Sequence, residues 1–297
     1  MPTFHILLAL CAAHCLNDLL QSVITAVSPM LKADLGLNFG DIGLITLVYQ
    51  CAASLFQPVV GFAFDRRPFV WSLPAGMCAT AAGILMFAFA GSFAWVLVSV
   101  FMVGLGSATL HPEASRITSL AGHERRGFAQ SVFQVGGNFG GSIGPLLVAL
   151  IVAPLGRAYV SLFIIFALLA FRAMAPICRW YAGYLADQRK REEKKEAHAV
   201  LPLSKGRTIL TIGVIMVLII SKYVYMASLS SYYTFYLIDK FGVSVSVSQL
   251  CLFVFVVSTA AGTLVGGPVG DRYGRKTVIW ISILGTEPFS MLMPNVS

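Results

Sequence analysis

Charged residues are scarce in this chain. Asp, Glu, Lys and Arg make up 11% of its 297 residues, whereas hydrophobic residues make up 57%. Soluble domains carry about a quarter charged residues, so an ordinary soluble fold is excluded. The apolar residues form runs of roughly 20 residues or more, which are long enough to cross a bilayer. The nine runs lie near 4–30, 41–64, 69–91, 93–120, 127–153, 158–178, 207–229, 246–269 and 277–297.

Motifs of catalysis and metal binding are lacking as well. His111-Pro112-Glu113 does not have the spacing of the zinc-protease motif, and there is neither a nucleophile elbow nor a phosphate-binding loop. The six cysteines form no CxxC pair, so we expect no disulfide framework and no metal site. Short loops between the apolar runs leave no room for a soluble catalytic domain. The sequence therefore predicts a protein that is not an enzyme and that uses no cofactor.

Acidic residues are fewer than basic ones, and the net charge is +8. The basic residues gather after the second, fourth, sixth and eighth runs, whereas the intervening loops hold little more than Lys32, Arg157 and Lys240. This alternation is the positive-inside pattern of multi-pass membrane proteins, and it places the N-terminus in the cytoplasm. It indicates a lipid bilayer, not a nucleic acid, as the partner. The first run lacks a basic n-region and a cleavage site, so we interpret it as an uncleaved membrane helix.

A loop that joins glycine, an acidic residue and basic residues occurs twice. The first copy is Gly61-x3-Asp65-Arg66-Arg67, and the second, six runs later, is Gly267-x3-Asp271-Arg272-Tyr273-Gly274-Arg275-Lys276. Such a repeat indicates a duplicated helical bundle, an architecture typical of transporters. A mixed-charge stretch separates the copies. We predict a six-helix N-terminal bundle over 1–183, a charged cytoplasmic linker over 184–206 and a partial C-terminal bundle over 207–297.

One polar stripe follows the first apolar run. His14, Asp18, Gln21 and Thr25 are spaced i, i+4, i+7, i+11, which places them on one face of a helix. Asp18 lies about 21 Å along that helix from Phe4, near the middle of a bilayer. A carboxylate at that depth costs roughly 2.5–3.5 kcal/mol, so it should face a wet cavity or a partner. We predict that Asp18 and His14 handle protons and that Gln21 contacts substrate; the alternative is a polar clamp between helices.

Two further runs hold charged groups in apolar surroundings. The fourth contains His111, Glu113 and Arg116, which can hold an anion or pass a proton unless they are the snorkelling end of a helix. The seventh contains Lys222 with Tyr225 nearby, which suits an anionic or polar substrate, and snorkelling is again the alternative. We predict that Glu113 takes part in proton coupling and that the other four contribute to substrate binding.

Glycines recur at intervals of four residues in the fifth run. Gly136, Gly140 and Gly144 fall on one face of a helix, and Pro145 follows them. Small residues at this spacing let two helix backbones approach closely in a membrane. We therefore predict a helix-packing surface at these four residues.

These motifs resemble those of the major facilitator superfamily, whose loop between helices 2 and 3 reads roughly G-x-x-x-D-R-x-G-R-[RK] and is echoed between helices 8 and 9. The second copy here matches well, whereas the first has Arg67-Pro68 where the glycine is expected. Gly140-x3-Gly144-Pro145 resembles the fifth-helix motif of the drug/proton antiporters. More narrowly, the chain looks like the fosmidomycin resistance group along nearly its whole length, in the motif His14-x2-Asn17-Asp18-x2-Gln21-Ser22, the segments 106–116 and 129–138, and Ser221-Lys222-Tyr223.

The resemblance implies an all-α, twelve-helix membrane fold, of which this chain would end in the ninth helix. It implies proton-coupled export of a small anionic drug such as fosmidomycin across a bacterial inner membrane. It also implies that five loop residues gate the cavity by pairing with helix ends: Asp65, Arg66, Asp271, Arg272 and Arg275. Two alternatives stay open, namely transport of another small metabolite, and a truncated fragment that does not transport unless its missing C-terminal half is supplied in trans.

Overall fold

The part of the chain that the structure describes is helical and contains no strand. The computed structural model describes residues 3–192, 206–207, 209–218, 221, 225, 236–237, 240–243 and 245–292. Its contacts divide the chain into two units, a first unit of Met1–Ala186 with Thr263–Ser297 and a second unit of Asp187–Gly262. The helices and their apolar composition confirm the predicted all-α membrane fold.

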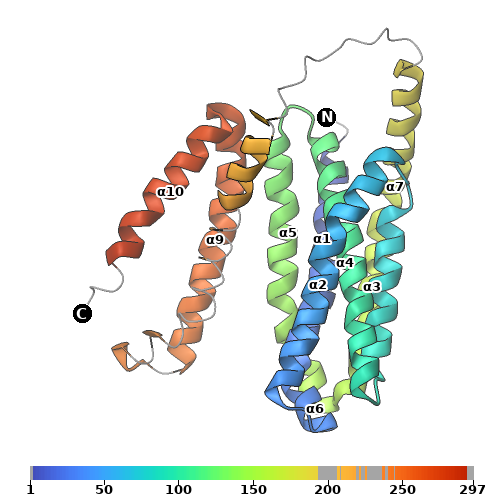
Figure 1. Cartoon of the computed structure of the whole chain (residues 1–297), viewed down its shortest axis with the longest axis vertical. Helices are drawn as coiled ribbons and strands as arrows, with labels where there is room; N and C mark the ends of the chain where they lie inside the picture. The colour runs from blue at the N-terminus through green and yellow to red at the C-terminus, as the bar shows by residue number, and fades with distance from the viewer. Residues whose placement is uncertain are drawn as a thin grey trace. The chain divides into compact units, whose positions relative to one another are not determined.

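The helices of the first unit follow the predicted apolar runs (Figure 1). In chain order they are α1 (Phe4–Leu35), α2 (Phe39–Arg66), α3 (Ser72–Ala88), α4 (Phe93–Gly122) and α5 (Arg126–Leu147). A π-helical turn η1 (Val148–Val152), α6 (Ala153–Leu155) and a 3-10 helix η2 (Arg157–Phe163) lead into α7 (Ile164–Glu192). Further along the chain come α9 (Val245–Tyr273) and α10 (Arg275–Leu292). In the second unit, a short apolar helix covers Ile209–Leu218.

Five helical stretches among the described residues are long and apolar enough to cross a membrane. They are Phe4–Ser28, Gly40–Arg66, Phe93–Gly122, Arg126–Leu155 and Arg157–Gln188. The third run forms a shorter helix, and the sixth run differs most from its predicted end at 178. Helix α7 continues to Glu192 because the residues beyond the apolar part are mainly Ala, Leu, Gln, Arg, Lys and Glu, which favour helix. It therefore enters the segment predicted to be a linker.

Local hydrogen bonds explain where helices begin and end. Asn38 Oδ1 accepts from the backbone nitrogen of Asp41 at 3.0 Å, and Asp41 Oδ2 accepts from the backbone nitrogen of Asn38 at 2.9 Å, so α2 starts with a capping box. Gly36 closes α1 at φ 63°, a left-handed conformation that suits glycine. Gly274, at φ 91°, turns the chain between α9 and α10 in the repeated loop motif.

Helix α1 packs closely against α5, and glycines make this contact possible. A Cβ atom added at Gly136 would collide with the carbonyl oxygen of Cys11, and one at Gly140 with that of Cys15. At Gly144 it would lie 2.8 Å from the carbonyl oxygen of Leu19. The glycine stripe therefore faces α1 at each successive turn, and the two backbones touch where no side chain fits.

Arg157 ties three parts of the first unit together at one end of the bundle. Its Nη1 donates to the carbonyl oxygen of Phe87 at 2.9 Å, and its Nη2 to that of Ala90 at 2.7 Å. Its Nε donates to Oδ2 of Asp34 at 3.1 Å. The last carbonyl groups of a helix lack partners within it, and the planar guanidinium bonds at once to one carbonyl group in the last turn of α3 and one just beyond its end.

Arg157→Ala is expected to lower the thermal unfolding midpoint of the purified chain in detergent, measured by tryptophan fluorescence. Hydrogen bonds to a charged group are worth about 1.5–3 kcal/mol each. The variant loses these bonds and leaves the carbonyl oxygen of Phe87 with only long backbone contacts such as that from the nitrogen of Ala90 at 3.4 Å. Arg157→Lys keeps the charge but not the planar guanidinium that bonds to both carbonyl groups. Its midpoint should therefore lie between those of the parent and of Arg157→Ala. The exposed Arg179 provides the control, as Arg179→Ala. Equal midpoints for Arg157→Ala and Arg179→Ala would contradict this role.

Candidate functional site

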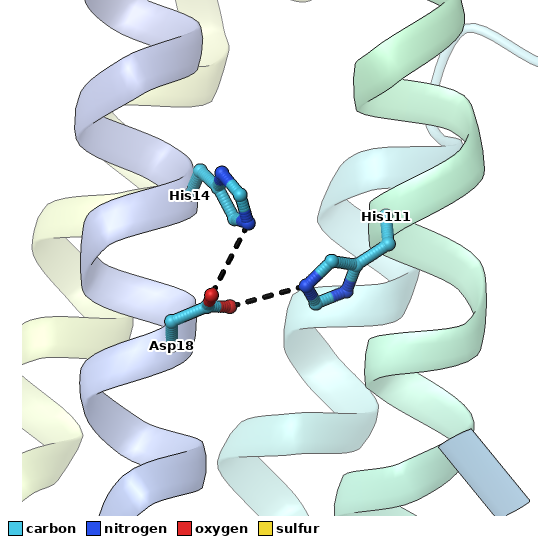
Figure 2. A group of neighbouring side chains, drawn as sticks. All are labelled: His14, Asp18 and His111. Carbon is cyan, nitrogen blue, oxygen red and sulfur yellow. Dashed lines mark ion pairs between the residues drawn. The ribbon is translucent and has the colours of Figure 1, made fainter. Parts of the chain in front are cut away.

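Three titratable side chains meet inside the first unit. His14 and Asp18 come from successive turns of α1, and His111 comes from α4 (Figure 2). Nε2 of His14 lies 3.2 Å from Oδ2 of Asp18, and Nε2 of His111 lies 3.2 Å from Oδ1. The side chain of His14 is 2% exposed, whereas those of Asp18 and His111 are 22% and 27% exposed. Each carboxylate oxygen therefore has its own imidazole in a site that is only partly closed.

Backbone carbonyl groups orient both imidazoles. Nδ1 of His14 lies 2.7 Å from the carbonyl oxygen of Phe133 on α5, and Nδ1 of His111 lies 3.0 Å from that of Ser107 on α4. A carbonyl oxygen only accepts, so each Nδ1 donates. Oγ of Ser107 also lies 3.2 Å from Nδ1 of His111, but the hydroxyl group donates its hydrogen to Oε1 of Gln21, so this oxygen accepts from Nδ1 as well. The rings of His14 and Phe133 also stack, with 3.9 Å between their centroids. Both Nε2 atoms are thus directed to the carboxylate of Asp18.

Glycine on α5 allows the cluster to form. A Cβ atom at Gly137 would lie 2.6 Å from Nε2 of His14 and 2.7 Å from Oδ2 of Asp18, too close for either contact to persist unchanged. The position next to the packing glycine Gly136 therefore closes one side of the cluster with backbone alone. The packing of α5 on α1 and the geometry of the polar site depend on each other.

The donor set of the cluster has more than one chemical use. The ligand atoms of His14, Asp18 and His111 lie within 4.8 Å of one another. Two imidazoles and one carboxylate are able to hold protons, and they are also a set that a divalent cation accepts. The absence of a CxxC pair and of the zinc-protease spacing predicted no metal site, but neither pattern indicates that α4 supplies a second imidazole next to α1.

A second polar group adjoins the cluster one turn further along α1. Oε1 of Gln21 accepts from the hydroxyl group of Tyr49 on α2 at 2.5 Å and from Oγ of Ser107 on α4 at 3.2 Å. Gln21 is 9% exposed, and its Nε2 has no hydrogen-bond partner among the described residues. A buried donor without a partner costs about 1–3 kcal/mol, so this amide is suited to donate to a bound molecule.

Glu113 and Arg116 form an ion pair further along α4. Nε and Nη2 of Arg116 donate to the two carboxylate oxygens of Glu113 at 3.0 Å and 2.5 Å. Nη2 also donates to the hydroxyl group of Tyr181 on α7, and Oδ1 of Asp65 lies 3.8 Å from Nε. Glu113 is 2% exposed, so the pair neutralises its charge inside the bundle. A cavity of about 360 Å³ between α2 and α4 is lined by Asp65, Glu113 and Arg116 among others.

The second copy of the repeated loop motif contacts a helix end within the first unit. The carboxylate oxygens of Asp271 accept from the backbone nitrogens of Gly127 and Phe128 at 2.9 Å each. These nitrogens belong to the first turn of α5, where the N–H groups lack partners within the helix and the helix dipole is positive. The pairing places an acidic side chain where a helix best accepts one.

The remaining predicted residues lie elsewhere. The guanidinium of Arg66 lies 4.1 Å from the ring centroid of Phe62, and that of Arg272 lies 5.3 Å from that of Tyr273. Arg275 is the first residue of α10, and Pro145 is part of α5. Lys222 lies outside the described residues. Tyr225 is 38% exposed and belongs to the second unit.

Sequence reasoning missed two tyrosines. Tyr49 bonds to Gln21, and Tyr181 bonds to Arg116, although Tyr49 lies in an apolar run and Tyr181 just beyond the end of one. A tyrosine in a membrane run is an ambiguous signal, because its ring is apolar and only its hydroxyl group needs a partner. Knowledge of which helices are neighbours is needed to find that partner.

Comparison with known proteins agrees with the fold and the motifs. Residues 10–286 match the Major Facilitator Superfamily. The chain is 50% identical to the fosmidomycin resistance protein of Escherichia coli K12, over 99% of this chain and 72% of that protein. It is 39% identical to an uncharacterized MFS-type transporter, YfnC, of Bacillus subtilis 168, over 98% of this chain and 71% of the relative.

A solved structure supports the same fold. The proton:xylose symporter XylE superposes with a TM-score of 0.66 at 16% identity, over 93% of this chain and 70% of that one. At this identity the likeness concerns the fold alone. The family match covers most of the chain, and the first relative covers nearly all of it at half identity. This protein therefore belongs to the major facilitator superfamily of membrane transporters.

Proposed function

We propose that this transporter exports a small anionic compound in exchange for protons, with fosmidomycin as the first compound to test. The observation that carries the proposal is the carboxylate of Asp18 held between His14 and His111 in a bundle of apolar helices. Titratable groups at such depth in a membrane are costly and generally functional. The identity to the fosmidomycin resistance protein supports the choice of compound.

The proton-coupling residues in this proposal form two groups on the same bundle. Asp18 and His14 exchange protons with water through the partly exposed side of their cluster. Glu113 takes part through its bidentate pair with Arg116, since protonation of that carboxylate would release the guanidinium. A change of protonation at either group alters which side chains face the cavity. Alternating access in this fold proceeds by rocking of one bundle against the other.

The substrate-binding residues are proposed to act at several depths. Gln21 donates from its unpartnered Nε2 to an oxygen of the substrate. His111 connects this amide with the proton site, because its Nε2 contacts Asp18 and its Nδ1 lies 3.2 Å from Oγ of Ser107, which bonds to Gln21. Arg116 becomes available to an anion when its pair with Glu113 opens. Lys222 and Tyr225 are also proposed to contact substrate, because a cation and a hydroxyl group suit an anionic or polar compound.

Gating is proposed for the two repeated loops. Asp271 holds the first turn of α5 through two hydrogen bonds, and release of that turn would accompany a change of face. Asp65 has a comparable place in the first copy, next to Arg116. Arg66, Arg272 and Arg275 are proposed to stabilise these closed states at the membrane surface.

The charge of the cluster favours a second candidate function. Protons make the cluster more positive, so an anion in direct contact with it would bind better when the protons are bound. Direct contact would then move anion and protons in the same direction, as in the uptake of a small anionic metabolite. Export in exchange for protons instead requires the charged group of the anion to bind at a cation that protonation of a carboxylate does not release, and Lys222 is the predicted candidate.

A transport assay in proteoliposomes decides between these functions. With the membrane potential clamped to zero, fosmidomycin should accumulate in the lumen when the lumen is acidic, because exchange moves drug against the proton flow whatever the protein orientation. Accumulation when the lumen is alkaline would favour uptake together with protons. Transport that ignores the pH gradient would refute coupling, and no transport of fosmidomycin would refute this choice of substrate.

Topology in a bacterial inner membrane is proposed with a cytoplasmic N-terminus, because the basic loops alternate. In a background without the six cysteines, a cysteine at Lys190 should resist a membrane-impermeant maleimide added to intact cells. A cysteine at Gly91, in the exposed turn after α3, should react under the same conditions and serves as the control. Labelling of position 190 from outside would reverse the proposed orientation.

A further inference from the structure

The hydrogen bonds around His14, Asp18 and His111 limit where protons can bind. Nδ1 of each imidazole donates to a backbone carbonyl oxygen, so only Nε2 is left to take up or release a proton. Each Nε2 lies 3.2 Å from its own oxygen of Asp18. Without a proton, each contact would set a nitrogen lone pair against a carboxylate oxygen. With one proton, each becomes a charge-assisted hydrogen bond.

The surroundings offer little other compensation for charge. Asn17 donates to Oδ1 of Asp18 at 3.3 Å from α1 itself. The other titratable neighbours are Cys15 on α1 and Tyr49 on α2, while α5 contributes only the carbonyl group of Phe133 and the backbone at Gly137. Among the described residues, the two histidines are the only ion-pair partners of Asp18.

Glu113 and Arg116 on α4 do not alter this balance, because they neutralise each other. The charge of the cluster therefore follows its own protons. It is formally −1 when both Nε2 atoms are bare, zero with one proton and +1 with two. Occupancy of both contacts is the state in which every polar atom of the three side chains has a matched partner.

We propose that His14, Asp18 and His111 form a single site that binds two protons, one in each contact between Nε2 and the carboxylate, and that a transport cycle empties and refills both. The protons leave from Nε2 to water, while the hydrogens on Nδ1 stay with the carbonyl groups. This inference rests on the proposed proton coupling. It goes further by assigning His111 to the proton site and by fixing the number of protons.

Transport at its limiting gradient measures that number. With the membrane potential clamped to zero, two protons per substrate let one pH unit support about a hundredfold gradient of fosmidomycin, and one proton only about tenfold. This ratio holds for exchange and for uptake alike. His14→Gln and His111→Gln keep an amide near Asp18 but remove one exchangeable proton each, so each should reduce the limiting gradient from about hundredfold to about tenfold. His5→Gln, at an exposed position of α1, should leave it unchanged.

A second measurement does not depend on transport. In the purified chain labelled with 15N-histidine, the five imidazoles can be followed by NMR, and the same two variants assign His14 and His111. We expect Nδ1 of both to remain protonated over the whole titration while both Nε2 atoms gain a proton as the pH is lowered. The titration of each should change when the other is replaced, but not when His5 is.

Several results would overturn the two-proton site. They are a limiting gradient of about tenfold per pH unit in the parent, an unchanged gradient in both His→Gln variants, and an Nε2–H tautomer at either histidine. A stoichiometric transition metal that stays bound through EDTA, with both Nε2 atoms bare, would also overturn it. Loss of all pH coupling together with the expected NMR behaviour would instead refute the proposed function and leave the two-proton site standing.

Discussion

Asp18→Asn is expected to abolish the accumulation of substrate against its gradient while the protein remains folded. The amide has the shape of the carboxylate, and it can still donate to one neutral Nε2 and accept from Nδ2 of Asn17. It cannot exchange a proton, and it cannot form an ion pair with a protonated imidazole. A pH gradient therefore no longer drives transport. Accumulation of fosmidomycin in proteoliposomes with an acidic lumen should fall to the level of protein-free liposomes, while downhill exchange of substrate should persist in part.

Matched variants separate titration from shape at this position. Asp18→Glu keeps the titration but extends the side chain towards the backbone at Gly137, so we expect partial activity. Asp34→Asn removes a carboxylate from the same helix at a position that is 45% exposed and distant in the chain from the cluster, and it should retain uphill transport. If Asp18→Asn still concentrates substrate to the parental level, Asp18 is structural and Glu113 becomes the leading proton carrier.

The spacing of residues within one helix predicted much of the site. The stripe on α1 placed His14, Asp18 and Gln21 on one face, and the structure shows His14 and Asp18 in contact at i, i+4. This works because the helical period fixes which side chains share a face before any neighbour is known. The same rule pairs Glu113 with Arg116 at i, i+3, whereas the sequence-based prediction gave Glu113 a role in proton coupling and Arg116 a role in substrate binding.

The partners from other helices could not be predicted in this way. His111 of α4 and Tyr49 of α2 reach the stripe only because of the way the helices pack, and a helical period says nothing about which helix lies opposite. The glycines of α5 did predict a close contact, but not that α1 would be the partner or that Gly137 would border the polar cluster. The end of α7 was predicted wrongly for a different reason, because charged residues that favour helix extend it beyond its apolar run.

Gly140→Leu is expected to prevent correct assembly of the first unit, with the largest effect on folded yield of any substitution in the glycine stripe. A Cβ atom at this position would overlap the carbonyl oxygen of Cys15, which belongs to the backbone and cannot be moved by changing a side chain. Helices α1 and α5 would have to separate, and the contacts of His14 with Phe133 and with Asp18 would open with them. The yield of monodisperse protein after extraction in mild detergent should fall severalfold.

The adjacent residue offers the control, because Gly141 has no atom within 4 Å of an added Cβ. Both substitutions remove a glycine from a helix interior, and this change by itself favours the helix. For alanine in place of glycine the gain is about 0.8–1.0 kcal/mol. Any loss specific to position 140 therefore reports the contact with α1. Gly140→Ala and Gly141→Ala repeat the comparison with a single methyl group. Equal yields in both pairs would show that α1 and α5 have room to spare, and the close approach on which the His14–Asp18 contact depends would then have to be given up.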